Sequence, residues 1–375
     1  MKVAIIGGSV GGLIAGIALK KDGHEVNIYE RSPSEMQGRG AGLVVQPNLM
    51  NYMTATGITS QQLFGVPALQ RQILNNQGYV TYRYENDTSF TSWNYLWKQL
   101  KQYFPAELYH YNHKLSAVKQ IGDVVESIFA DGQTITADLL VGADGYSSVV
   151  REHIYPGIEP VYAGYVAYRG LIPETELTDD EVDFFSNKFT LYPYNNSHLL
   201  AYLVPGNNGE LDKGNRQLNW VWYLNKNFQD YKNLMTDKDG RFRQFSVPAT
   251  FMSPENVTNL RERAKKELPQ ILADRVLQTT YPFVQAIVDM EVPKMYKGRI
   301  TILGDAAAVV RPHTASGTAK AYEDAVALAY VLSKYKDTDQ ALKAWNDAEL
   351  VYAADLIAYG RKLAKGSGLG IGYQR

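Results

Sequence analysis

The chain has 375 residues, of which 45% are hydrophobic, and its formal net charge at pH 7 is −1. This length predicts two packed domains, and the small charge gives no electrostatic reason to bind nucleic acid or an acidic membrane. No cysteine is present, which excludes disulfide bonds, thiolate catalysis and cysteine-ligated metal.

The first thirty residues have the pattern of a dinucleotide-binding βαβ unit. An apolar run, a glycine-rich turn, an apolar helix and a second strand follow one another at residues 3–6, 7–12, 13–19 and 26–29. The turn lets the backbone approach a pyrophosphate, the helix N-terminus offers unpaired N–H groups, and Glu30 accepts hydrogen bonds from ribose hydroxyls. Ser9 replaces the middle glycine of the motif, so its Cβ crowds the phosphate slightly while its hydroxyl can bind it. We therefore expect a bound dinucleotide.

The chain continues with loops at 31–42, one of which carries the cation Arg39. Arg39 either neutralises the pyrophosphate or is a solvated loop residue. A hairpin, a helix and an antiparallel meander are then expected at 73–82, 93–103 and 114–141. The meander leads through a strand into a second glycine turn, Gly-Ala-Asp-Gly at 142–145.

The middle of the chain has a different sequence pattern from the first part. Four alternating, aromatic-rich runs predict an antiparallel sheet, at residues 165–172, 189–194, 198–204 and 217–224. In the last run Trp220 and Trp222 point one way, whereas Asn219 and Tyr223 point the other. We expect one face of this sheet to be buried and the other to roof a cavity. This second domain is inserted into the first.

The first domain resumes near Arg299. A buried strand ends in Gly-Asp-Ala-Ala at 304–307, followed by a proline-containing loop at 311–317 and two helices. The expected boundaries are 1–72, 94–160 and 282–365 for the first domain and 73–93 and 161–281 for the second. Residues 366–375 are expected to form a flexible tail.

The βαβ unit, the Gly-Ala-Asp-Gly turn and the Gly-Asp-Ala-Ala turn with Pro312 and Gly317 behind it stand in a specific order. Together they resemble the FAD-dependent class A aromatic-ring monooxygenases, the group that contains p-hydroxybenzoate hydroxylase. The segments 157–165, 168–170 and 311–313 are similar to those of the 2,6-dihydroxypyridine 3-hydroxylase branch. The resemblance implies an α/β fold: a Rossmann-like FAD-binding domain of the GR2 type with an inserted antiparallel-sheet substrate domain.

The resemblance also implies which residues hold FAD. Glu30 would bind the adenosine ribose and Asp305 the ribityl chain, and Asp144 belongs to a motif used for both FAD and the nicotinamide cofactor. A helix N-terminus near Gly317 would stabilise negative charge on the reduced flavin. The full set of expected cofactor residues is Gly7, Ser9, Val10, Gly11, Glu30, Arg31, Arg39, Val44, Leu115, Asp144, Asp305, Gly317, Thr318 and Ala319.

For catalysis the candidate is His313, because a histidine pKa suits proton transfer near neutrality and a base that ionises a substrate hydroxyl makes the ring more nucleophilic. The alternative is a histidine packed in its loop. Pro312 is expected near the substrate, and Gln46 either contacts flavin or substrate or makes a structural hydrogen bond. The expected roof of the pocket consists of Tyr192, Tyr202 and Trp222, although aromatic side chains on a sheet are often only core. We expect Arg169 to be an interdomain contact.

The sequence thus predicts an FAD-dependent monooxygenase that uses NADH or NADPH and dioxygen. It would hydroxylate a small hydroxylated aromatic or N-heteroaromatic ring through a flavin C4a-hydroperoxide. The alternatives are an enzyme of the same fold that attacks a larger, non-phenolic compound such as an antibiotic, and a flavin-binding protein without turnover. We expect no metal, a monomer or homodimer and, because the first strand begins almost at Met1, a cytoplasmic protein without a signal peptide.

Overall fold

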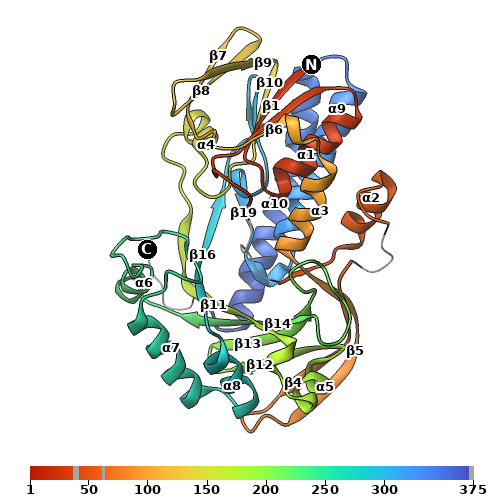
Figure 1. Cartoon of the computed structure of the whole chain (residues 1–375). Coiled ribbons are helices and arrows are strands. Elements are labelled where there is room, and N and C mark those ends of the chain that lie inside the picture. The colour runs from red at the N-terminus through yellow and green to blue at the C-terminus, as the bar shows by residue number, and fades with distance from the viewer. Residues whose placement is uncertain (37–41, 61–63, 371–375) are drawn as a thin grey trace.

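The structure, a computed structural model, describes residues 1–36, 42–60 and 64–370. Its upper half in Figure 1 is built on a six-stranded sheet with the order β17-β18-β10-β1-β2-β6. In that order the strands span Tyr296–Lys297, Ile300–Ile302, Leu139–Gly142, Lys2–Ile6, Glu25–Tyr29 and Tyr109–His110. Strand β1 pairs in parallel with both β2 and β10, and β10 pairs in parallel with β18. The carboxyl ends of these four strands therefore lie at one edge of the sheet.

Helices cover this sheet. Helix α1 (Val10–Lys21) is buried from Val10 to Leu19 except at Gly11, which suits a helix enclosed between the sheet and its neighbours. The remaining helices of this half are α2 (Pro47–Thr56), α3 (Trp93–Tyr103), α4 (Val149–Ile154), α9 (Gly317–Lys334) and α10 (Thr338–Gly366). A small antiparallel sheet lies at the top, with β7 (Leu115–Ile121), β8 (Val124–Phe129) and β9 (Thr134–Ala137).

The lower half contains a ten-stranded sheet with the order β15-β16-β11-β14-β13-β12-β4-β5-β3, while β19 pairs separately with β16. The strands of this order span Ser246–Val247, Phe283–Glu291, Val161–Pro173, Gln217–Asn225, Ser197–Val204, Lys188–Tyr194, Val66–Leu74, Val80–Ser92 and Gly42–Val44, and β19 spans Ala308–Val309. All these pairings are antiparallel except that of β12 with β4. The helices here are α5 (Asp179–Phe185), α6 (Phe228–Leu234), α7 (Pro254–Glu267) and α8 (Gln270–Gln278).

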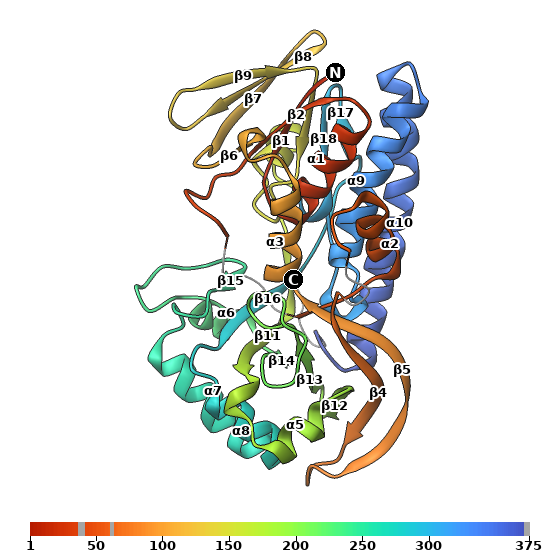
Figure 2. The same cartoon turned by 45° about the vertical axis from the view of Figure 1, so that its right-hand side comes forward.

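The two faces of this sheet differ in what they contact. One face packs against α7 and α8, which lie below the sheet in Figure 2, and the indole of Trp220 on this face donates to Thr279 Oγ1 over 2.8 Å. The opposite face meets the first domain. The predicted α/β fold, with a Rossmann-like domain and an inserted sheet domain, is confirmed. The sheet itself extends beyond the expected boundaries, because β4 begins at Val66 and β16 continues to Glu291.

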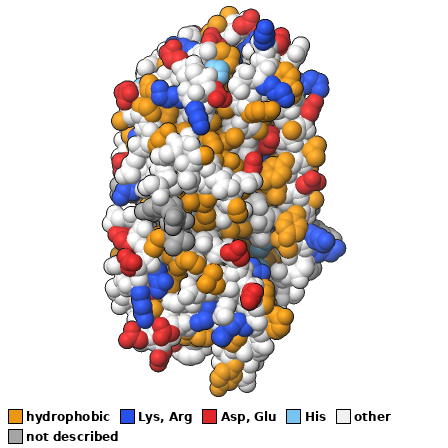
Figure 3. All heavy atoms as spheres, turned by 90° about the vertical axis from the view of Figure 1, so that its right-hand side faces the viewer, with side chains coloured by type: hydrophobic (Ala, Val, Ile, Leu, Met, Phe, Trp, Pro, Cys, Tyr) orange, Lys and Arg blue, Asp and Glu red, His pale blue; other side chains and the backbone are white. Residues whose placement is uncertain are grey.

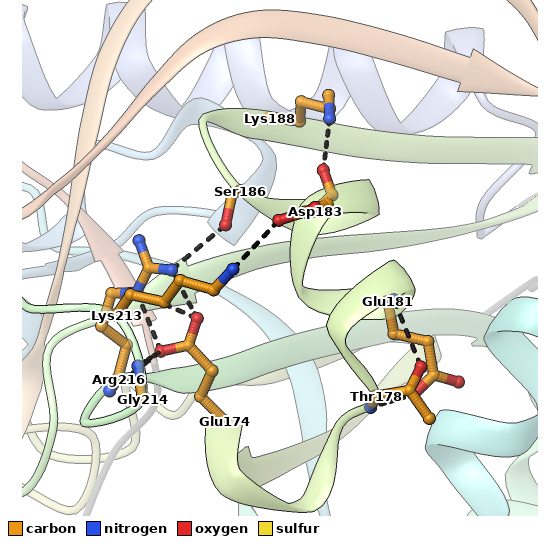
Figure 4. Close-up of polar contacts among 9 residues, drawn as sticks. All are labelled: Glu174, Thr178, Glu181, Asp183, Ser186, Lys188, Lys213, Gly214 and Arg216. Atoms are coloured by element: carbon orange, nitrogen blue, oxygen red, sulfur yellow. Dashed lines mark hydrogen bonds and ion pairs between the residues drawn. The ribbon is translucent and has the colours of Figure 1, made fainter.

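Polar contacts hold the connection between β11 and α5 in place (Figure 4). Glu174, in the 3₁₀ turn η2 (Glu174–Glu176), forms an ion pair with Arg216 and accepts a hydrogen bond from the backbone N–H of Gly214. Thr178 and Glu181 form a capping box at the start of α5. Further 3₁₀ turns are η1 (Ala106–Leu108), η3 (Gly304–Ala306) and η4 (Pro312–Thr314).

Helix α10 runs alongside both halves of the molecule in Figures 1 and 2 and leads the chain back to the second sheet. Leu369 is buried there, and the N–H of Gly370 donates to Asn225 Oδ1 over 2.8 Å. Residues 366–370 are thus part of the packed structure rather than a flexible tail, because an apolar side chain and two hydrogen bonds from this segment involve β14. The remaining tail residues, 371–375, lie outside the described part.

The surface carries charges of both signs. On the face drawn in Figure 3, basic and acidic side chains are interspersed with hydrophobic ones. Among the described residues, no helix combines the length and the apolar character needed to cross a membrane.

Candidate active site

The structure brings the three sequence motifs together at one edge of the first sheet. The glycine turn follows β1, Glu30 follows β2, Asp144 follows β10 and Asp305 follows β18. Backbone hydrogen bonds fix these turns side by side: Gly7 N donates to Tyr29 O over 2.9 Å and Ala143 N to Ile6 O over 2.7 Å. The carboxyl edge of a parallel sheet is where doubly wound folds bind ligands.

The first turn leaves no room for a side chain at Gly7. Its φ is +105°, and a Cβ would lie 2.4 Å from the carbonyl oxygen of Ala143. Beside it, the buried carboxylate of Glu30 accepts hydrogen bonds from the N–H groups of Gly8 and Ser32, each over 2.8 Å. A carboxylate has about four lone-pair sites, so Glu30 is oriented by the backbone and still has capacity for ribose hydroxyls.

The N-terminus of α1 is arranged for an anion. Ser9 occupies the N-cap position, yet in the described structure its side chain caps none of the helix N–H groups. The backbone N–H groups of Val10 and Gly11 lie in the first turn of α1, where the helix itself provides no acceptor for them. They are therefore available to an anion. Gly11 allows α9 to approach closely, since a Cβ there would lie 3.3 Å from Ala321 Cβ.

Asp305 lies in η3 among buried polar groups. Burial raises the pKa of its carboxyl to about 6, and the positive charge of Lys320 and a hydrogen bond with Tyr146 oppose that rise. Lys320 in turn donates to Asp324 over 2.5 Å, and Asp324 accepts from Gly304 N over 2.8 Å. Asp324 of α9 thus fixes the Gly-Asp turn through the hydrogen bond from Gly304 N.

The other expected cofactor residues occupy different environments. Both carboxylate oxygens of Asp144 accept hydrogen bonds within its own turn, from Ser148 Oγ and from the N–H of Val149, so Asp144 shapes the turn and the start of α4. Arg31 is exposed, whereas Leu115 is buried at the start of β7. Arg39 lies outside the described residues.

The proline-containing loop meets the second sheet. His313 lies in η4, and its Nε2 is 2.9 Å from the hydroxyl oxygen of Tyr165 on β11. Arg311 forms an ion pair with Asp289 of β16 over 2.6 Å, and its guanidinium lies 5.5 Å from the centre of the Tyr165 ring. This ion pair joins the two domains beside His313.

Aromatic rings surround His313. Its ring centre lies 4.4 Å from that of Tyr223 and 5.4 Å from that of His198. Burial, together with the charges of His198, Arg311 and Arg169, lowers the pKa of His313 to about 3, and burial lowers the pKa of His198 to about 4. Both imidazoles are therefore neutral at physiological pH. We call Tyr165, Arg169, His198, Tyr223 and His313 the seam cluster, because they lie where the two domains meet.

Further expected residues lie next to the loop of His313. The amide of Gln46 donates to Ala315 O over 3.0 Å, which ties the segment after β3 to this loop. Pro312 begins η4, and Gly317, Thr318 and Ala319 form the first turn of α9, whose N-cap Ser316 makes no side-chain cap within the described structure. Val44 packs near Tyr202, which stacks on Phe90 with 3.7 Å between ring centres.

Two of the expected roof residues are on the wrong face. Trp222 donates its indole N–H to Tyr194 Oη and Ser197 Oγ, and Tyr192 stacks on Tyr194 and points its hydroxyl towards Glu267 of α7. Side chains alternate along a strand, so Tyr192 and Trp222 belong to the face under the helices. Only Tyr202 of the three lies on the face that meets the first domain.

The site residues expected from the sequence do not include Tyr165, His198, Tyr223 or Asn219. For two of them, Asn219 and Tyr223, the sequence does contain a signal: the alternation in β14 places both on its more polar face.

Arg169 lies close to the first domain, since its charge lowers the pKa of His313 and opposes the rise in the pKa of Tyr146, so its expected role as an interdomain contact stays a prediction. Among the described residues no ion pair or hydrogen bond joins Arg169 to the first domain, whereas Arg311 forms an ion pair between the domains.

Taken together, these groups suit FAD. The glycine turn has no room for a Cβ, Glu30 presents an oriented buried carboxylate and Asp305 a half-buried one. The two helix starts have no side-chain cap within the described structure. These features match a dinucleotide with hydroxyls and a pyrophosphate. The seam cluster lies behind the Gly-Asp turn, where a flavin ring attached to that dinucleotide would meet a substrate.

Comparisons with known proteins agree with this arrangement. Residues 1–168 match a family model described as FAD binding domain, and residues 162–289 match one described as FAD binding domain-like. The chain is 36% identical to the 2,6-dihydroxypyridine 3-monooxygenase of Paenarthrobacter nicotinovorans, over 93% of this chain and 87% of that protein. It is 26% identical to the 6-hydroxynicotinate 3-monooxygenase of Bordetella bronchiseptica, over 91% and 85%.

Solved structures show the same relationship. The 2,6-dihydroxypyridine-3-hydroxylase from Arthrobacter nicotinovorans superposes with a TM-score of 0.93 at 34% identity, covering 100% of this chain and 94% of that one. Klebsiella pneumoniae HpxO, solved with FAD and uric acid, has a TM-score of 0.79 at 21% identity, covering 98% and 89%, which reflects a shared fold.

Proposed function

This chain belongs to the FAD-dependent class A aromatic-ring monooxygenases, and we propose that its substrate is a small pyridine ring with two oxygen substituents, of the 2,6-dihydroxypyridine type. It is an FAD-dependent monooxygenase that draws electrons from NADH or NADPH and hydroxylates an aromatic or heteroaromatic ring. The observation that carries the finer proposal is the 36% identity to a dihydroxypyridine monooxygenase over 93% of the chain.

The cofactor, once bound and reduced, supplies an activated oxygen that an electron-rich ring can accept. The protein's part is to bind, to orient and to keep water away. Glu30 and the N-terminus of α1 would hold the dinucleotide end, while Asp305 would hold the chain that leads to the flavin. The N-terminus of α9 offers N–H groups to the flavin edge.

The seam cluster is proposed to act on the substrate. The pKa of His313, lowered to about 3, departs from the value near neutrality that the sequence led us to expect, so the imidazole is a weak base. Because it is neutral, it can accept a hydrogen bond from a ring hydroxyl. Its Nε2 is engaged with Tyr165, and among the described residues no hydrogen bond is made by Nδ1. We therefore assign the substrate contact to Nδ1 and the orientation of the ring to Tyr165.

The test is substrate-stimulated oxidation of NADH or NADPH by the FAD-loaded protein. The probes are 2,6-dihydroxypyridine, 6-hydroxynicotinate and 3-hydroxybenzoate, with product mass as the second readout. We expect 2,6-dihydroxypyridine to stimulate oxidation most and to gain one oxygen atom. Inactivity of all three probes would point to a larger substrate or to a protein without turnover, and hydrogen peroxide without a hydroxylated product would contradict the proposal.

A further inference from the structure

Arg169 is a cation for which the described part of the chain shows no acidic partner. Its Nε is shielded from solvent and has no hydrogen-bond partner, and no ion pair involves its guanidinium in the described part of the chain. By contrast Arg216, Arg275 and Arg311, also largely buried, each pair with a carboxylate. The thirteen undescribed residues, at 37–41, 61–63 and 371–375, include no Asp or Glu. These segments therefore supply no further acidic side chain for Arg169.

The position of Arg169 places it in the seam cluster. It lies on β11 four residues from Tyr165, and therefore on the same face of the strand. Its charge reaches the neighbouring rings, since it lowers the pKa of His313 and opposes the burial-driven rise in the pKa of Tyr202 and Tyr223. With both histidines neutral, Arg169 is the cation of this cluster. A largely desolvated, unpaired charge is costly, and an anion that binds beside it removes that cost.

A second unpaired donor lies next to it. Asn219 is fully buried, its Oδ1 accepts from Gly42 N over 3.0 Å, and its Nδ2 has no partner among the described residues. Arg169 is directly opposite Val221 in the sheet register, so Asn219, two residues along β14, is its diagonal neighbour on the same face. Such neighbours are separated by about 7–8 Å and are bridged by long side chains or by a ligand. Guanidinium and amide N–H groups both require an acceptor.

We propose that Arg169 anchors the substrate ring as an anion through its ionised oxygen, while Asn219 donates to a second oxygen on the same ring. This inference rests on the proposed function and adds two residues that select the ionic form and the substitution pattern of the substrate. An ionised ring is richer in electrons than the neutral ring, so its selection favours oxygen transfer. The cation therefore assists the reaction by holding the anion rather than opposing attack on the ring.

The test measures the ionisation of a bound probe in the FAD-loaded protein. The probe is 5-fluorouracil, a planar ring with two oxygens whose ¹⁹F resonance shifts on ionisation. In the unmodified protein we expect the pKa of the bound probe to fall by at least one unit, which is about a tenfold preference for the anion. Arg169→Met should abolish this fall and weaken binding of the ionised probe about tenfold or more, and Arg169→Lys should keep part of it.

The Asn219 contact has a different signature. Asn219→Ala should weaken binding several-fold at every pH without moving the pKa of the bound probe, because it removes a neutral donor. Arg71→Met is the matched control. Arg71 lies on β4 of the same sheet, contacts Phe189 and Tyr84, and is not part of the seam cluster. It should leave both quantities unchanged. FAD content and thermal unfolding identify any variant that fails to fold, in which case the unmodified protein and Arg169→Lys decide.

An unchanged pKa of the bound probe in the unmodified protein, or an equal fall in Arg169→Met, would overturn the inference. The experiments distinguish a failure of this inference from a failure of the proposed function. Hydroxylation of 2,6-dihydroxypyridine without a pKa shift of the probe would refute only the role of Arg169. A clear shift without hydroxylation of any probe would refute the proposed substrate and leave the anion site in place.

Discussion

The hydroxyl of Tyr165 and the Nε2 of His313 lie 2.9 Å apart, which joins a strand of the second sheet to the loop behind the Gly-Asp turn of the first domain. The contact crosses the boundary between the domains at the point where the substrate is proposed to bind. Its effect is to fix the plane of the imidazole and to leave Nδ1 as the available nitrogen. Tyr165 is therefore a positioning residue, and His313 is the proposed hydrogen-bond acceptor for the substrate hydroxyl.

Substitution of these two residues should separate their roles. His313→Gln removes the imidazole, and we expect the kcat for hydroxylation to fall roughly 10–10²-fold, as for loss of a hydrogen bond to a substrate oxygen. Tyr165→Phe should lower kcat less and shift its pH profile, because the imidazole remains but loses its orienting bond. Tyr194→Phe, which alters a hydroxyl under α7, is the control. Unchanged kcat and an unchanged pH profile in His313→Gln would remove His313 from the mechanism.

Stability should fall in acid because of the buried histidines. The pKa of His198 is lowered to about 4 in the folded protein but is about 6.5 in the unfolded chain, so the unfolded chain binds more protons between these values. The free energy of unfolding should thus decrease as pH falls from about 6.5 towards 4, by roughly 2 kcal/mol for His198. Urea unfolding at pH 7 and pH 4.5 with saturating FAD measures this. His198→Asn should reduce the difference; equal pH dependence would contradict the assignment.

Glu349 should have the opposite effect. Burial, and next the negative charge of Asp324, raise its pKa to about 8, so the folded protein binds the extra proton between pH 4.5 and 8. The stability contributed by this proton is complete below pH 4.5 and is lost as pH rises through 8. Glu349→Gln, which keeps the shape without the charge, should flatten the fall in the free energy of unfolding between pH 6 and 9. A variant that follows the unmodified protein over this range would show that Glu349 does not titrate there.

The glycine turn gives a steric prediction. Gly7→Ala combines a positive φ with a Cβ 2.4 Å from Ala143 O, so the turn must move away from its neighbour. We expect the variant to lose FAD, with a dissociation constant raised at least about tenfold, or to unfold at lower temperature. Gly366→Ala is the control, because a Cβ at this exposed position at the end of α10 meets nothing within 4 Å. FAD fluorescence on titration and the melting temperature are the measurements, and normal FAD affinity and melting in Gly7→Ala would refute the steric argument.

The fold could be predicted from sequence because its signals are local. The turn before Val10, the acid at Glu30 and the Gly-Asp turn each follow an apolar strand, and parallel pairing then requires them to share an edge. The alternation in β14 likewise separated the two faces of the second sheet correctly.

The site was harder to predict, because which face meets the first domain depends on long-range packing. Aromatic size favoured Trp222 and Tyr192, but their apolar rings pack under α7, while the smaller and more polar Asn219 lies on the opposite face. The proposed role of Arg169 depends on the absence of an acidic side chain beside it among the described residues. In the sheet register Arg169 faces Val221 and Phe283, so neither directly opposed residue is acidic, and this pairing depends on long-range contacts that no local sequence pattern indicates.

The order of the strands at the carboxyl edge also constrains when the holoprotein can form. Glu30 precedes Asp305 by 275 residues, so the first glycine turn and Glu30 are synthesised well before Asp305 and the start of α9. A growing polypeptide that stops before residue 300 lacks β18, which completes the parallel core beside β10. Cofactor loading is therefore a late event of biogenesis, and a chain released early is an incomplete receptor for FAD however well its amino-terminal unit has folded.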